Sequence, residues 1–342
     1  YQIPALAVDG CAIVVSPLIS LMHDQVMALQ QVGVSAAVYN SSLSTAERRD
    51  VMDSLRFEQL KLLYVSPEQL MMDGFLESLP PISLFAIDEA HCISEWGHDF
   101  RPSYRHLSHI KQVFQNTPIM ALTATATGRV LGDIQSQLEM TSAQLFRGSF
   151  NRPNLFYDIR PKKDTYKHLL AEIKQRPDES GIVYCQSRRS VESVAEKLQK
   201  DGIQALPYHA GLSINIRKDN QEQFKHDRVQ VIVATIAFGM GIDKPDVRFV
   251  VHYDLPKTIE NYYQETGRAG RDGLDSRCIL FYSYGDTLKY ESFIRDMSDA
   301  NERRLATQKL QQMTKFAFQP ICRRKQLLHY FDEDYDEKSC NT

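Results

Sequence analysis

The sequence lacks the features of a membrane-spanning or disulfide-stabilised protein. No apolar run approaches the ~18 residues that a membrane-spanning helix needs, and no signal-peptide pattern opens the chain. The 342 residues contain six cysteines and no C-x-x-C pair, so we expect reduced thiols and no disulfide framework. These absences favour a globular protein of the cytoplasm.

A large charge of one sign is also lacking. The formal net charge is −3, which does not by itself predict a nucleic-acid-binding protein. Residues 1–148 carry 9 basic and 15 acidic residues, whereas residues 149–342 carry 31 and 28. Any surface that binds phosphate groups would therefore have to be local.

Short apolar runs alternate with amphipathic helical patterns along most of the chain. The apolar runs fall into two groups, at 12–16, 62–66, 84–88 and 119–123, and at 181–185, 229–235, 247–253 and 278–282. Helical patterns lie between them at 19–31, 46–55, 190–201 and 215–226. This alternation predicts the α/β class, with one parallel sheet for each group of strands.

The two groups of strands predict two domains and a helical C-terminal part. We expect a first domain at residues 1–148, an irregular, proline-containing hinge at 149–163, and a second domain at 164–296. A helical amphipathic stretch follows at 297–342.

One apolar run ends in two adjacent carboxylates, Asp88 and Glu89. Open α/β sheets bind ligands at the carboxyl ends of their strands. In such a Walker B arrangement the aspartate holds Mg²⁺, which prefers hard oxygen ligands, and the glutamate polarises the water that attacks the γ-phosphate. Taken alone, Asp-Glu-Ala-His is better explained as an acidic turn after a strand, so other motifs must decide.

Three other motifs accompany this one. They are Ser-Pro-Leu-Ile-Ser-Leu at 16–21, Thr-Ala-Thr-Ala-Thr at 123–127 and Gln-Glu-Thr-Gly-Arg-Ala-Gly-Arg-Asp-Gly at 264–273. The last is the most specific, because its arginines Arg268 and Arg271 are three residues apart and should project from one face toward phosphate. A guanidinium group forks onto phosphate oxygens through two hydrogen bonds.

In this order the motifs resemble those of superfamily 2 helicases, and most closely those of the RecQ family of ATP-dependent DNA helicases, with the bacterial members nearest. The stretches at 88–102, 150–154, 208–212 and 237–242 carry the resemblance further. It implies two RecA-like domains, ATP and Mg²⁺ as cofactors, and 3′–5′ unwinding of DNA in recombination and repair. The implied partner is DNA, single-stranded or at duplex junctions, and the implied location is the bacterial cytoplasm, at the nucleoid.

The resemblance also assigns DNA-binding residues. An aromatic-rich loop after the Asp-Glu-Ala-His motif couples DNA binding to hydrolysis in that family, and aromatic faces stack on bases of any sequence at ~1–3 kcal/mol per base. Trp96 and Phe100 could instead belong to the core, but polar neighbours interleave them. For Ser187 and Arg188 a solvated strand end is an alternative. The full set is Ser16, Pro17, Trp96, His98, Phe100, Arg101, Ser187, Arg188 and Thr235.

On the nucleotide side, the resemblance assigns Arg271 as the arginine finger and the Thr-Ala-Thr motif as the link between hydrolysis and movement. The residues expected at the nucleotide or in catalysis are Asp88, Glu89, His91, Gly239, Gly241, Asp243, Gln264, Arg268 and Arg271.

Two departures from the family pattern concern cofactors. RecQ helicases carry a four-cysteine zinc module, and only Cys322 and Cys340 match it here, so the resemblance implies two ligands of an incomplete Zn²⁺ site. The phosphate-cradling G-x-x-x-x-G-K-[ST] motif is absent from the 342 residues. Because the chain also starts at Tyr1 rather than at methionine, we expect a fragment of a longer helicase, itself deficient in ATP hydrolysis.

Two alternatives remain open from the sequence. The core motifs are shared across the superfamily, so the chain could belong to an RNA helicase. It could also be a non-catalytic DNA-binding or regulatory module.

Overall fold

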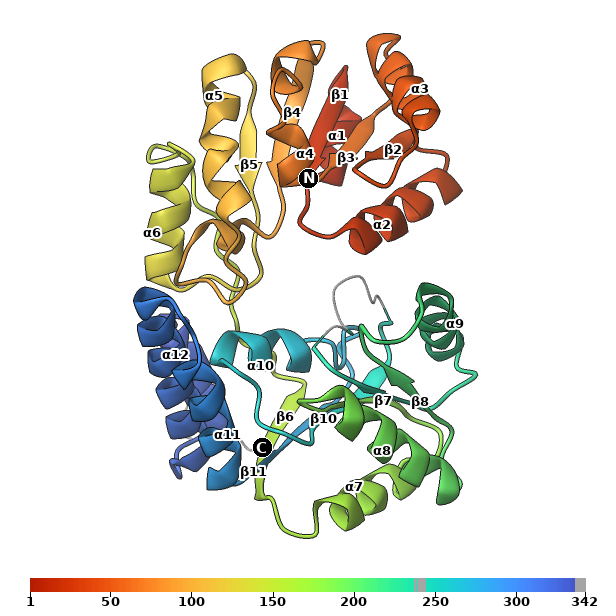
Figure 1. The fold of residues 1–342 in the computed structure, drawn as a ribbon, viewed down its shortest axis with the longest axis vertical. Coiled ribbons are helices and arrows are strands. Elements are labelled where there is room, and N and C mark those ends of the chain that lie inside the picture. Colours follow the sequence, from red (N-terminus) through yellow and green to blue (C-terminus); the bar gives the residue numbers. More distant parts are fainter. Residues whose placement is uncertain (237, 239–243, 336–342) are drawn as a thin grey trace. The chain divides into compact units, whose positions relative to one another are not determined.

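The structure is a computed structural model that describes residues 1–236, 238 and 244–335 (Figure 1). The chain divides into two compact units, Tyr1–Arg147 and Gly148–Thr342. Over the described residues, we find no helix with the length and apolar character needed to cross a membrane.

The first unit is built on a parallel sheet with the strand order β2-β3-β1-β4-β5. β1 lies at its centre and pairs with β3 and β4, and all of its residues are buried because helices cover both faces. The strands are β1 (Cys11–Val15), β2 (Ala36–Tyr39), β3 (Leu62–Val65), β4 (Ile82–Ile87) and β5 (Ile119–Ala121).

Successive residues of β1 point to opposite faces and so enter two separate cores. Ile13 and Val15 pack with α3 (Thr45–Arg56), α5 (His109–Val113) and α6 (Gly128–Gln137). Ala12 and Val14 pack with α1 (Gln2–Ala7) and α2 (Ile19–Gln31). α3 begins after Ser44 because Ser44 and Glu47 form a capping box there. The short helix α4 (Pro67–Leu70) and three 3₁₀ helices, η1 (Leu76–Ser78), η2 (Ala90–Ile93) and η3 (Pro102–Ser108), complete the unit.

The second unit contains a parallel sheet with the strand order β6-β11-β10-β7-β9-β8. Helices again cover both faces: α7 and α8 pack on one, and α9 packs on the other. The strands are β6 (Leu155–Pro161), β7 (Ser180–Tyr184), β8 (Ala205–Tyr208), β9 (Val231–Ala234), β10 (Val247–His252) and β11 (Ser276–Tyr282). The helices are α7 (Thr165–Lys174), α8 (Arg188–Lys200), α9 (Ile214–Lys225) and α10 (Ile259–Thr266).

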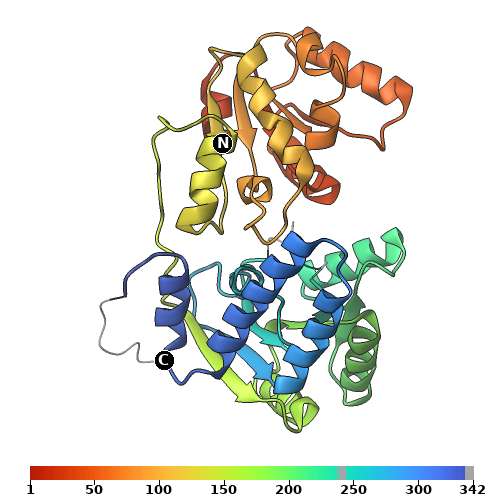
Figure 2. The same cartoon turned by 60° about the vertical axis from the view of Figure 1, so that its left-hand side comes forward.

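Three helices follow the last strand. α11 (Tyr284–Arg295) and α12 (Ala300–Phe318) lie side by side as a hairpin, and α13 (Arg323–Tyr330) follows them (Figure 2). Residues of α12 and α13, including Met313, Phe316 and Leu327, pack against α10 in one apolar cluster. The helical C-terminal part is therefore joined to the second sheet through α10.

The prediction of two parallel α/β sheets is confirmed, and the eight predicted strands are present. Three further strands, β2, β6 and β8, were not predicted. One of them corrects the predicted hinge at 149–163, because Leu155–Pro161 forms β6 and pairs with β11 along its whole length. These residues therefore belong to the second sheet.

Candidate nucleotide and nucleic-acid sites

Asp88 and Glu89 follow β4 at the carboxyl edge of the first sheet. The amide of Asp88 donates to the carbonyl of Val15 over 2.9 Å, which fixes the position of Asp88 against the end of β1. Glu89 has a left-handed backbone, with φ of 48°, and this sharp turn leads directly from the strand into η2. Two carboxylates are thus held side by side where the strand ends.

The surroundings of these carboxylates are suited to a cation. Burial, and after it the negative charge of Glu89, raises the pKa of Asp88 to about 6. Oε2 of Glu89 is buried and has no hydrogen-bond partner within the described residues, although Nδ1 of His91 lies 3.2 Å away. A hard divalent cation would offset the repulsion between the two carboxylates and bind the oxygen ligands that it prefers. These residues therefore fit Mg²⁺.

His91 connects the carboxylates to two other motifs. It is buried, and its Nδ1 lies 2.9 Å from Oγ1 of Thr123, in the Thr-Ala-Thr motif. Its ring stacks on that of His98, with 4.1 Å between centroids and 22° between planes. One side chain thus contacts the Glu89 carboxylate, the segment after β5 and the aromatic-rich loop.

Trp96 has a mixed environment in this loop. It is half-buried and packs against the core that lies between the first sheet and helices α3, α5 and α6. The guanidinium carbon of Arg129 lies 3.2 Å from the centre of its ring. Ser94 supports the loop by donating a hydrogen bond to Asp133 and accepting one from the Trp96 amide over 3.1 Å. Neither Arg129 nor Asp133 was predicted, since nothing local in α6 marks them as partners of a loop some 35 residues away.

Gly97 holds the loop close to the Asp-Glu-Ala-His segment. A Cβ atom at this position would lie 2.3 Å from the carbonyl oxygen of His91 and 3.0 Å from that of Ser94. No side chain fits at such distances without displacing the backbone.

Arg101 ties the same loop to the Ser-Pro motif. Its Nη1 donates to the carbonyl of Pro17 over 2.7 Å, and Nε and Nη2 lie 3.3 Å from Asp99. Phe100 is half-buried beneath the guanidinium group of Arg105, at 4.9 Å. Ser16 is only 1% exposed, and its hydroxyl has no hydrogen-bond partner in the described part of the chain. A contact between that hydroxyl and DNA would require the surrounding segment to open.

The two motif arginines of the second unit follow the end of α10 and differ in burial. α10 ends at Thr266, so neither Arg268 nor Arg271 lies on a regular helix. Arg268 is buried and hydrogen-bonds Tyr184 at the end of β7, whereas Arg271 is exposed. Gln264, on the last turn of α10, is half-buried.

The other predicted DNA contacts of the second unit lie at the carboxyl ends of the neighbouring strands β7 and β9. Ser187 is exposed and caps α8 by accepting a hydrogen bond from the amide of Ser190 over 3.1 Å. Arg188 is exposed, and its Cδ and Nη1 atoms lie 3.1 Å from the position that a Cβ atom at Gly211 would occupy. Thr235 is half-buried after β9. Their common edge of the sheet allows all three to contact one ligand.

Four predicted residues, Gly239, Gly241, Asp243 and Cys340, lie outside the described residues. Cys322 is half-buried and precedes α13 as its N-cap residue. Among the residues that the structure describes, no three His, Cys, Asp or Glu side chains form a group that could hold a metal ion.

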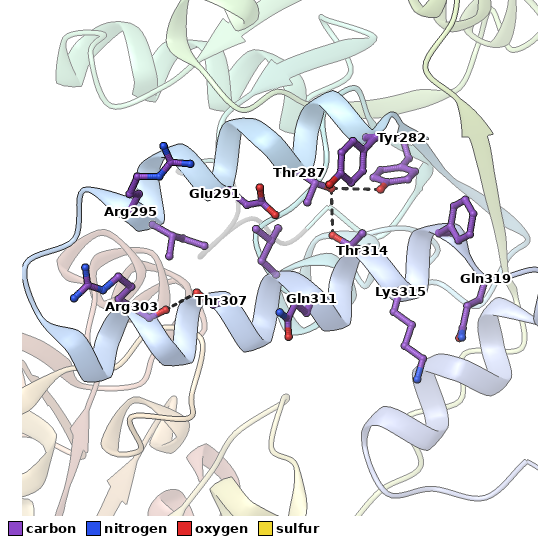
Figure 3. A pocket seen from close by; sticks show the side chains of 14 residues that line it. Tyr282, Thr287, Glu291, Arg295, Arg303, Thr307, Gln311, Thr314, Lys315 and Gln319 are labelled. Atoms are coloured by element: carbon purple, nitrogen blue, oxygen red, sulfur yellow. Dashed lines mark hydrogen bonds between the residues drawn. The ribbon is translucent and has the colours of Figure 1, made fainter.

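A groove of about 790 Å³, which no sequence motif predicts, lies along the α11–α12 hairpin (Figure 3). At one end Thr287 bridges two elements, since its Oγ1 lies 3.3 Å from the Tyr282 hydroxyl and 3.2 Å from Oγ1 of Thr314. These hydroxyls join the hairpin to the end of β11.

Comparison with known proteins shows which class of protein carries these features. Three family models match the chain: DEAD/DEAH box helicase at residues 1–134, helicase conserved C-terminal domain at 162–273 and RecQ zinc-binding at 284–342. Solved structures show the same fold at 17% identity. The DNA-bound helicase MrfA has a TM-score of 0.67, covering 93% of this chain and 48% of that one. Yeast Dbp5 with RNA and ADP BeF₃ has a TM-score of 0.66, covering 93% and 79%.

The fold and the matched models define a helicase of the DEAD/DEAH class with two RecA-like domains in tandem. The similarity of individual sequences is more specific. The ATP-dependent DNA helicase RecQ of Haemophilus influenzae is 47% identical over 343 residues, covering 100% of this chain and 55% of that protein. Its Pasteurella multocida counterpart is 47% identical over 99% of this chain and 54% of its own length.

The chain belongs to the RecQ family, and it spans about half the length of these relatives. The matched domains imply the use of ATP and Mg²⁺ and a zinc-binding segment.

Proposed function

We propose that the natural protein containing this chain is an ATP-dependent DNA helicase that unwinds DNA in the 3′–5′ direction during recombination and repair. The observation that carries the proposal is the contact series from Glu89 through His91 to His98. It joins carboxylates suited to ATP hydrolysis with a loop whose aromatic side chains suit single-stranded DNA.

In this proposal the first unit supplies the acid–base chemistry. Asp88 would hold Mg²⁺, which would supply positive charge to neutralise the phosphates. Glu89 accepts a proton from the attacking water. His91 orients Glu89, and its 2.9 Å contact with Thr123 couples the position of Glu89 to the Thr-Ala-Thr motif. Gln264, Arg268 and Arg271 of the second unit bind the nucleotide, and Arg271 stabilises charge in the transition state. Gly239, Gly241 and Asp243 lie outside the described residues, and only the family resemblance assigns them to the nucleotide.

Binding of DNA and hydrolysis are coupled through the loop. A base that stacks on Trp96 or Phe100 shifts the loop, and the stacked pair of His98 and His91 transmits that shift to Glu89. Ser16, Pro17 and Arg101 of the first unit and Ser187, Arg188 and Thr235 of the second hold the strand backbone.

The domain limits also remain proposals: residues 1–148 for the first RecA-like domain, β6 together with 164–296 for the second, and 297–342 for the zinc-binding segment. We propose Cys322 and Cys340 as two of its zinc ligands, and action at DNA junctions on the bacterial nucleoid.

The test compares nucleic acids in the natural protein. We expect ATP hydrolysis to be stimulated more by single-stranded DNA than by RNA of the same sequence, and a 3′-tailed duplex to be unwound faster than a 5′-tailed one. Glu89→Gln serves as the background control and should abolish both activities. Greater stimulation by RNA would support the RNA-helicase alternative. A wild-type protein as inactive as Glu89→Gln would support the non-catalytic module.

A further inference from the structure

The segment at 149–155 contacts the loop that carries Arg268 and Arg271, more than 110 residues later in the chain. Nη2 of Arg152 donates to the carbonyl of Ala269 over 3.0 Å and to that of Gly270 over 2.8 Å, and Nη1 lies 3.4 Å from the carbonyl of Gly267. One guanidinium group therefore contacts the backbone on both sides of Arg268.

Asn154 fixes the same loop from a second position. Its Nδ2 donates to the carbonyl of Gly270 over 2.8 Å and to that of Leu274 over 2.9 Å. Gly270 has φ of 55°, and a Cβ there would lie 2.5 Å from Nδ2 of Asn154. The backbone between the two motif arginines is therefore held in one conformation that requires glycine.

A third set of contacts, made by α13 and the residue after it, holds the 149–155 segment itself. Arg324 is only 4% exposed. Its guanidinium group donates to Oδ1 of Asn151 over 2.8 Å and to the carbonyls of Arg152 and Leu155 over 2.6 and 2.7 Å. The ring of Phe331 stacks on Phe150 at 4.4 Å and 8°. Contacts thus run from α13, through residues 150–155, to the arginine loop.

A guanidinium group suits this arrangement because its planar fork reaches several carbonyl oxygens at once, which a lysine ammonium cannot do in the same geometry. Hydrogen bonds from a charged donor are also roughly twice as strong as those between neutral groups. The loop is therefore held in place before any phosphate arrives.

We propose that Arg152 and Arg324 are positioning residues for the phosphate-binding arginines, acting through the backbone of residues 267–270. The proposal rests on the proposed function, since it assumes that Arg271 meets a phosphate. Holding the loop in advance removes reorganisation from the catalytic step, and displacement of a catalytic group by about 1 Å can cost about 10²-fold in rate.

The first experiment is a double-variant cycle on ATP hydrolysis in the natural protein. Arg152→Ala should lower kcat by roughly 10–100-fold with a smaller change in KM, and Arg152→Lys should rescue little. Combined with Arg271→Ala, it should lower kcat no further than Arg271→Ala alone, because Arg152 acts through Arg271. Arg324→Ala should behave in the same way.

Arg176 provides the matched control. It is a mostly buried arginine of the same unit, whose Nη1 contacts Glu172 at 2.7 Å and which makes no contact with the arginine loop. Arg176→Ala should change thermal stability without changing kcat. If Arg152→Ala behaves like Arg176→Ala, or if its effect multiplies with that of Arg271→Ala, the positioning role is overturned.

Hydrogen exchange separates this inference from the proposed function, because it needs no nucleotide. In the 342-residue chain, Arg152→Ala and Arg324→Ala should speed exchange of the amides at 267–274 while leaving β7 and β9 unchanged. Unchanged exchange at 267–274 would refute the positioning role of Arg152 and Arg324 and would leave the proposed function untouched. A wild-type natural protein without ATP hydrolysis would instead refute the proposed function, and with it the contribution of Arg152 and Arg324 to hydrolysis.

Discussion

Trp96 is the only tryptophan of the 342 residues, so its fluorescence reports on one place in the aromatic-rich loop. If the loop binds DNA as we propose, a base that stacks on the indole ring should quench its emission. The perturbation that tests this is Trp96→Ala, with Trp96→Phe as the variant that keeps an aromatic face.

The structure sets the expected cost in stability. Replacing a fully buried tryptophan or phenylalanine with alanine costs about 3–5 kcal/mol, and Trp96 is half-buried, so we expect about half of that. Loss of the Arg129 guanidinium contact adds about 0.5–1 kcal/mol. A total of roughly 2–3 kcal/mol should lower Tm by roughly 5–10 °C and leave the domain folded, because stabilities are about 5–15 kcal/mol.

The effect on DNA binding should be of comparable size. Stacking contributes about 1–3 kcal/mol per base, so Trp96→Ala should weaken binding of a single-stranded oligonucleotide by about 5–150-fold. Trp96→Phe should keep most of the affinity. The assay is an emission titration of the 342-residue chain, with fluorescence anisotropy of a labelled oligonucleotide as the independent measure of binding.

Arg129→Ala tests the packing separately. Uncovering the ring should shift emission of the unliganded chain to longer wavelength, while DNA should still quench it. Saturating DNA that leaves Trp96 emission unchanged would refute a role of Trp96 in stacking. Complete unfolding of Trp96→Ala at 25 °C would show that Trp96 is a core residue.

Three further predictions follow from the same sites. The 342-residue chain should hydrolyse ATP no faster than buffer, even with Mg²⁺ and single-stranded DNA, because it contains no G-x-x-x-x-G-K-[ST] motif; clear hydrolysis would mean that the phosphates bind elsewhere. In the natural protein, Arg271→Lys should lower kcat by about 10³–10⁵ with less change in KM and with DNA affinity intact; normal hydrolysis with lost DNA affinity would make Arg271 a DNA contact. Gly97→Ala, whose Cβ would lie 2.3 Å from the His91 carbonyl, should abolish stimulation by DNA but keep the basal ATPase rate; normal stimulation would exclude the loop from the coupling.

The strands that sequence could not predict have one property in common. β2 is an edge strand of the first sheet, and β6 and β8 are the two edges of the second. β6 and β8 are only partly buried, so they lack the continuous apolar run that marks a central strand such as β1. β2 is mostly buried but only four residues long. β8 contains Pro207, which is tolerated because the strand has a neighbour on one side only. β6 ends at Pro161 and includes Arg160, which made it resemble a connection.

The candidate site also combines residues that are close in the sequence, which could be predicted together, with contacts between distant residues, which could not. Asp88, Glu89 and the aromatic-rich loop lie within a dozen residues, so their proximity could be predicted. The contacts of Trp96 with Arg129, and of Arg152 with the loop after α10, join segments about 33 and 115 residues apart. A single sequence contains no periodicity or motif that pairs such positions, and only the packed fold brings them together.

If Arg268 and Arg271 both act on phosphate as we propose, their different environments give them different parts in the reaction. Arg268 is 8% exposed beside Tyr184, so its guanidinium group is already desolvated in the folded protein. It therefore contributes a positive charge at a fixed position. Arg271 is exposed, so in the proposed function it is the arginine that solvent-borne phosphate can reach and whose contact can change during a cycle. An exposed side chain is usually poorly positioned, yet the backbone next to Arg271 is held at Gly270 by both Arg152 and Asn154. An exposed guanidinium group on a fixed backbone can engage phosphate quickly and release it again, as repeated turnover requires.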